Sequence, residues 1–87
     1  MEKSLLSILK AEDRIVTDIA DSERMIAAFQ KERAKVESIP FNCEAKVQEL
    51  ASFDRIIANY QRDIEEYRPK LASVRTELRE YLMKFLK

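Results

Sequence analysis

The side chains that could perform chemistry are scarce in this sequence, and the missing types are informative. The chain has no histidine and no glycine, and Cys43 is its single cysteine. Without histidine, no imidazole can bind zinc or activate the Cys43 thiol as a nucleophile. Without glycine, there is no glycine-rich loop to hold the phosphates of a nucleotide. We therefore expect no enzyme, no metal site and no bound cofactor.

The carboxylates are the remaining candidates for acid–base chemistry. Glu12 and Asp13 are adjacent in sequence, as are Glu65 and Glu66. Adjacent side chains on a helix point about 100° apart, so these pairs do not converge on one substrate. We expect most acids to lie on a solvated face, and the sequence offers no catalytic residue.

The charge balance and the apolar runs bear on the partners and the compartment. The 87-residue chain has sixteen basic and sixteen acidic residues, so its net charge is zero. Binding to nucleic acid needs a surplus of basic residues, which this chain does not have. No stretch approaches the roughly 18 uncharged apolar residues of a membrane-spanning helix. A lone cysteine cannot form an internal disulfide, which favours a reducing compartment. We expect a cytoplasmic protein whose partner is neither nucleic acid nor a membrane.

The second half of the chain carries an unbroken heptad repeat of apolar residues. Such a repeat keeps one apolar seam facing a partner helix. With Leu50 taken as an a position, the a positions are Leu50, Ile57, Ile64, Leu71, Leu78 and Phe85, and the d positions are Phe53, Tyr60, Tyr67, Val74 and Tyr81.

Pro69 lies inside this repeat and raises the question of whether the helix stops there. It falls at an f position, opposite the seam, and the apolar phase continues after it without a slip. A proline in a helix interior removes one hydrogen bond and pushes against the preceding turn. Because that face is solvated, we expect a kinked but continuous helix. The alternative is a break at Pro69.

The first half is also helical, with a broader and less regular stripe. Three polar residues interrupt it, Glu12, Ser22 and Arg33, and a broad stripe is typical of a helix with several neighbours. Pro40 and Asn42 mark the connection that follows, with Asn42 as the expected N-cap of the second helix. The best seam of the first half is Met1, Leu5, Ile8, Glu12, Ile15, Ile19, Ser22, Ile26, Phe29, Arg33 and Val36.

These patterns predict one all-α domain, a coiled-coil-like antiparallel hairpin. We expect helices over about 3–38 and 43–86 with a turn at 39–42. A hairpin alone buries little apolar area, so we also expect oligomerisation into a four-helix or larger bundle, most simply as a homodimer. The alternative architecture is a monomeric three-helix bundle in which the chain folds back at Pro69.

Two groups of residues are candidate sites. The tyrosines of the seam and the apolar tail either fill a core or anchor a protein partner. The polar residues of the seam either set the register or, with arginines of the second helix, form a polar notch for an anionic ligand. The partner-binding candidates are Tyr60, Tyr67, Tyr81, Leu82, Met83, Phe85 and Leu86, and the notch candidates are Glu12, Ser22, Arg33, Arg62, Arg68 and Arg75.

Two functions fit these observations. The first is a protein-binding module, a small coiled-coil adaptor, inhibitor or chaperone-like subunit that occupies the surface of a partner protein. The alternative is a homo-oligomer that sequesters an anionic small molecule or nucleotide between its subunits. A phage-encoded or accessory protein would suit this size and charge balance.

Overall fold

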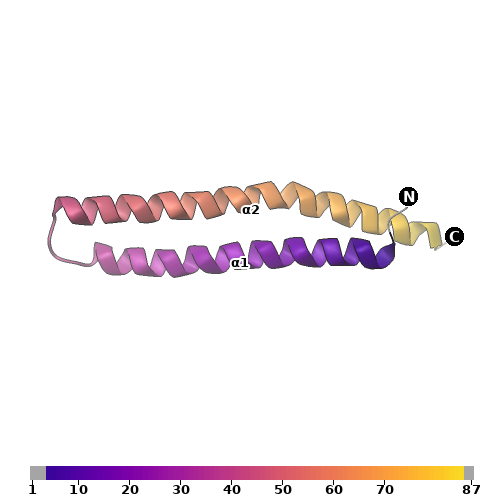
Figure 1. Ribbon diagram of the computed structural model, residues 1–87, viewed down its shortest axis with the longest axis horizontal. Coiled ribbons are helices and arrows are strands. Elements are labelled where there is room, and N and C mark those ends of the chain that lie inside the picture. The colour runs from indigo at the N-terminus through magenta and orange to yellow at the C-terminus, as the bar shows by residue number, and fades with distance from the viewer. Residues whose placement is uncertain (1–3, 86–87) are drawn as a thin grey trace.

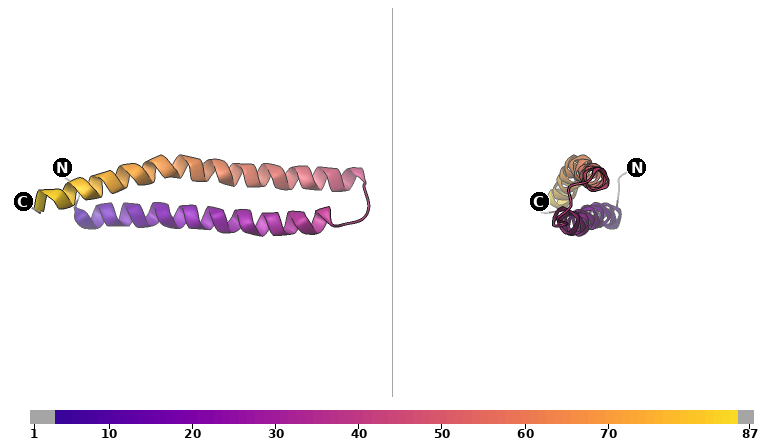
Figure 2. Two further views of the ribbon diagram at one scale, coloured as in Figure 1. Left: turned by 180° about the vertical axis from the view of Figure 1, so that it is seen from behind. Right: turned by 90° about the vertical axis from the view of Figure 1, so that its left-hand side faces the viewer.

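The computed structural model describes residues 4–85, which form two long helices joined by one turn (Figure 1). Helix α1 spans Leu5–Glu37 and helix α2 spans Glu44–Phe85. The helices run antiparallel and lie side by side along a rod of 67 × 17 × 16 Å, as the two further views in Figure 2 show. The all-helical hairpin expected from the sequence is confirmed. Helix α1 and the start of α2 lie within one or two residues of the expected bounds, whereas the expected end at residue 86 lies outside the described residues.

Local hydrogen bonds fix the ends of the helices. The Ser4 hydroxyl caps α1 by accepting from the Ser7 N–H at 3.2 Å, and this satisfies one of the free donors of the first turn. At the start of α2, the Val47 N–H donates to the Cys43 carbonyl at 3.1 Å. Cys43 is therefore the N-cap, and the expected N-cap at Asn42 is wrong by one residue. The turn is held by the Lys46 ammonium, which donates to the Ile39 carbonyl at 2.6 Å.

Helix α2 continues through Pro69. The exposed position of Pro69 leaves the freed carbonyl of the preceding turn open to water, so the helix bends instead of ending. The ribbon bends in its orange stretch and then inclines toward the start of α1 (Figures 1 and 2). The kinked, continuous helix is confirmed, and the three-helix alternative with a break at Pro69 is wrong.

The two helices meet along the seam that the heptads predict. Every seam position in residues 5–81 is at least partly buried, whereas Phe85 at the end of α2 is exposed. The burial is shallow, however: among the described residues only Ile8, Ile57 and Ile64 are buried apolar side chains, at 4%, 8% and 6% exposure. The hairpin has a seam but no enclosed core.

Helix α2 is longer than α1 and projects past it at both ends. Ion pairs join Glu12 to Arg75 and Arg33 to Asp54 across the seam. This register sets the start of α1 roughly level with Leu82 and its end roughly level with Leu50. Residues 44–49 and 83–85 of α2 therefore lie beyond α1, and Figure 1 shows the yellow end of α2 reaching past the indigo start of α1.

Replacing Pro69 by alanine should stabilise the hairpin. Alanine restores the backbone donor and removes the clash, so we expect the free energy of unfolding to rise by about 2 kcal/mol. Urea unfolding followed by circular dichroism at 222 nm, at one fixed protein concentration, measures this. Thr76→Ala, seven residues further along the same face, is the control and should change stability by less than about 0.7 kcal/mol. A loss of stability in Pro69→Ala would show that the bend itself is needed to keep α2 on α1.

Candidate protein-binding surface

The tyrosine stripe lies along the edge of the seam, where α1 covers part of it. Tyr60 stacks on Phe29, with ring centroids 6.0 Å apart, and Phe53 contacts the same ring at 6.2 Å. Tyr67 is half-buried, and the Lys70 ammonium lies 5.8 Å from its ring centroid. Within one chain these aromatic rings are thus partly used to join α1 to α2, while their outer edges stay accessible to a second protein.

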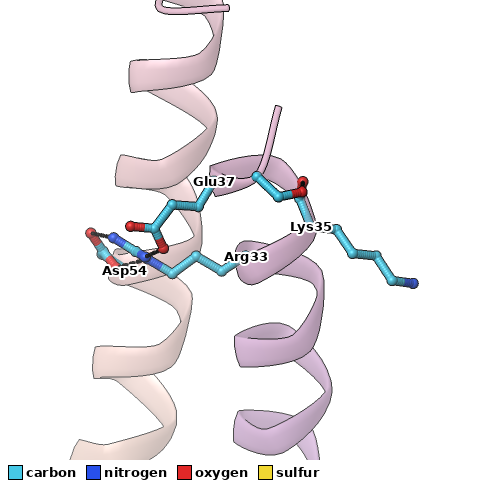
Figure 3. A network of polar contacts seen from close by, with 5 residues as sticks. Arg33, Lys35, Glu37 and Asp54 are labelled. Atoms are coloured by element: carbon cyan, nitrogen blue, oxygen red, sulfur yellow. Dashed lines mark hydrogen bonds and ion pairs between the residues drawn. The ribbon is translucent and has the colours of Figure 1, made fainter. Parts of the chain in front are cut away.

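The polar residues of the seam form two separate ion pairs. Arg33 donates to both carboxylate oxygens of Asp54, at 2.7 and 3.5 Å, and to Glu37 at 2.9 Å. Figure 3 shows Arg33 reaching from α1 to Asp54 on α2, while Lys35 points away. The hydrogen bond with Asp54 raises the pKa of the Arg33 guanidinium above its usual value, so it stays charged across the range in which proteins function.

The notch candidates are spread along the hairpin. Glu12, which accepts from Arg75 at 3.4 Å, and Arg33 are separated by about 32 Å at 1.5 Å per helical residue. Ser22 lies between them and is only 8% exposed. A single chain therefore does not bring Glu12, Ser22 and Arg33 into one site, and the first and last of them have partners across the seam.

Of the notch candidates, two exposed arginines are available to an anion, whereas no group of side chains in residues 4–85 is arranged to bind a metal ion. Arg62 and Arg68 are exposed and make no ion pair with another residue of 4–85. A shallow hollow beside Tyr60 carries the Asp63 carboxylate, which would repel an anion. Within residues 4–85, no group of three or more histidine, cysteine, aspartate or glutamate side chains is arranged to bind a metal ion.

Apolar side chains gather at the end of the hairpin where both termini lie, here called the open-end patch. Leu5, Tyr81, Leu82 and Phe85 line a groove of about 310 Å³, and the rings of Tyr81 and Phe85 are 5.0 Å apart. Leu86, also a candidate, lies outside the described residues. The exposed apolar residues at this end are Leu6, Leu9, Leu82, Met83 and Phe85, of which Leu82 and Phe85 line the groove.

A second apolar group, here called the turn patch, lies at the opposite end. Ile39, Phe41 and Val47 are all exposed, Phe41 by 71%. The sequence reasoning missed them because it treated the connection only as a turn. The sequence does indicate their exposure, because Phe41 directly follows Pro40 in the connection and Val47 falls outside the a and d positions of the heptad repeat.

Comparison with protein-family models, with curated proteins and with solved structures found no match. Neither helix, over the described range 5–85, combines the length and hydropathy needed to cross a membrane. The residues and geometry of the hairpin therefore carry the functional argument by themselves.

Reversing the charge of Arg33 should weaken the hairpin. In Arg33→Glu the new carboxylate faces Asp54 and Glu37, so we expect a lower urea midpoint than in the wild type. Adding Asp54→Arg should recover most of the loss, because the pair is restored with opposite polarity.

Lys35→Glu is the matched control for that change. Lys35 pairs with Glu32 inside α1 and points away from α2 (Figure 3), so its reversal should shift the midpoint much less than Arg33→Glu does. If Asp54→Arg fails to rescue Arg33→Glu, the Arg33–Asp54 pair does not contribute to the packing of α1 on α2.

Proposed function

We propose that this chain is a non-enzymatic protein-binding module, a small helical adaptor, inhibitor or chaperone-like subunit that acts by covering the surface of another protein. The observation that carries the proposal is the open-end patch, in which large apolar side chains stand exposed on a hairpin with a shallow seam. Contiguous exposed apolar side chains on a small protein mark an interaction surface. Because Cys43 is free and exposed, we place the module in the cytoplasm.

The total exposed area supports this proposal. The chain exposes 6983 Å², whereas a compact monomer of 10.2 kDa would expose about 5,300 Å². The excess, about 1,700 Å², is about twice the roughly 800 Å² that each partner buries in a standard protein–protein interface. The hairpin therefore has surface to give to a partner without loss of its own contacts.

The composition of the open-end patch suits a protein partner. Tyr81 and Phe85 pair their rings beside the groove, and aromatic side chains are common energetic anchors of interfaces. Leu9 extends the same surface along α1, since it lies four residues after the groove residue Leu5, and Leu6 neighbours Leu9 because it lies three residues before it.

The alternative, an oligomer that sequesters an anionic small molecule, has less support. Arg33 and Arg75 are each paired with carboxylates, and Arg62 and Arg68 belong to the same solvated helix. A thermal shift on addition of one member of a nucleotide panel, reduced in Arg68→Ala, would favour this alternative over the protein-binding module.

Glutamate substitutions in the open-end patch should abolish partner binding. The immobilised wild type, incubated with an extract of the source cells, should retain a partner protein in near-stoichiometric amount. Leu6→Glu combined with Leu82→Glu should retain about tenfold less or lower, because charged side chains would be buried unpaired in the interface. Quantitative mass spectrometry of the retained proteins measures the ratio.

The control variant combines Thr17→Glu with Thr76→Glu, which places the same charges on exposed positions away from the patch. It should bind like the wild type, and circular dichroism should show helix in all three proteins. Equal retention by the patch variant, or no protein retained by the wild type, would contradict the proposed function.

A further inference from the structure

We propose that one partner of the open-end patch is a second copy of this chain, packed antiparallel along the whole rod so that the turn patch of each copy covers the open-end patch of the other. The inference rests on the proposed function, since it names an occupant for the same apolar surface, and another protein would bind there by displacing the second copy. It also gives a role to the turn patch, which the proposed function leaves unused.

The positions of the two patches favour this arrangement. The turn patch lies at one end of a 67 Å rod and the open-end patch at the other. A two-fold axis across the middle of the rod exchanges these ends, so both patches of both copies are covered by one symmetric contact. A parallel pair would instead place the two turn patches beside each other at one end and the two open-end patches beside each other at the other end.

The distribution of charge along α2 separates the two arrangements further. Residues 44–66 carry six acidic and three basic side chains, whereas residues 67–85 carry two acidic and five basic ones. The first stretch has an excess of three negative charges and the second an excess of three positive charges. An antiparallel pair sets opposite excesses beside each other, and a parallel pair sets like excesses beside each other, which costs free energy.

The dimensions of the rod exclude an end-to-end contact as the main interface. An end face of 17 × 16 Å offers about 270 Å², well below the roughly 800 Å² that each partner of a standard interface buries. A side face of 67 × 17 Å offers about 1,100 Å², which is sufficient. The outer side of α1 supplies apolar contacts along that face, at Leu9 and Val16 between the patches.

The resulting assembly is an antiparallel four-helix bundle. Its centre would enclose the outer edges of the seam side chains that one hairpin leaves half-exposed, including Tyr60 and Tyr67. The side chain of Phe41, exposed in one copy, would lie at the groove lined by Leu5, Tyr81 and Phe85 of the other.

Cross-linking between the ends tests the arrangement. Lys84→Cys places a thiol at the open end, while the native Cys43 marks the turn end. Within one chain these thiols are about 60 Å apart at 1.5 Å per helical residue, so a short bismaleimide can join them only between copies. We expect Lys84→Cys to give a covalent dimer in high yield. Light scattering should give a mass of about 20 kDa for the wild type, twice the 10.2 kDa of one chain.

Two single-thiol proteins are the controls, the wild type with Cys43 alone and Lys84→Cys combined with Cys43→Ser. In an antiparallel dimer neither should cross-link, because like ends lie at opposite ends of the bundle. Cross-linking of either control would show a parallel pair and overturn the proposal. A dimeric mass without cross-linking of Lys84→Cys would also overturn it, since the unlike ends would not meet.

The turn patch gives an independent readout in solution. Phe41→Glu should weaken the dimer by about tenfold or more, measured as the dissociation constant from a concentration series, whereas Gln48→Glu should not. A wild-type mass of 10.2 kDa at all concentrations overturns the dimer but not the proposed function, provided that the wild type still retains another protein. A dimeric wild type that retains no other protein overturns the proposed function but not the dimer.

Discussion

Two helices can bury only the stripe along which they touch, and this constraint governs the rest of the structure. Each helix of the hairpin has a single neighbour, so side chains at a and d positions are covered on one side and open on the other. Ile8, Ile57 and Ile64 are the only apolar side chains among the described residues that the pairing buries. A second layer of helices would enclose the seam in the way that helix bundles do.

The polar residues of the seam show how such a thin interface holds one register. If α2 slipped by one heptad in one direction, Glu12 would still meet an arginine, Arg68, but Arg33 would meet the apolar Val47. In the other direction Glu12 would meet the apolar Leu82 and Arg33 the uncharged Gln61. Only the observed register satisfies Glu12 and Arg33 together, with Arg75 and Asp54 as partners. Polar groups in a seam commonly fix register in this way, at a cost in stability.

The sequence contains enough information for the secondary structure and the seam, because both depend on local periodicity. The heptads place the half-buried residues of α2 correctly, and the f position of Pro69 accounts for a bend in place of a break. The partners of Glu12 and Arg33 depend on how the two helices are offset, which is set by the turn and could not be derived from either helix alone. The exposure of Phe41 and Val47 could have been predicted, and it was missed because the connection was treated only as a turn.

For the protein-binding module proposed here, the shallow seam couples folding to binding. A hairpin whose apolar side chains are mostly half-exposed gains little from closing on itself, so a partner that covers the open side supplies most of the stabilisation. Part of the interaction free energy with a partner is then used to order the helices, which lowers the affinity per unit of buried area. A module of the proposed kind acts stoichiometrically, by remaining bound to its partner.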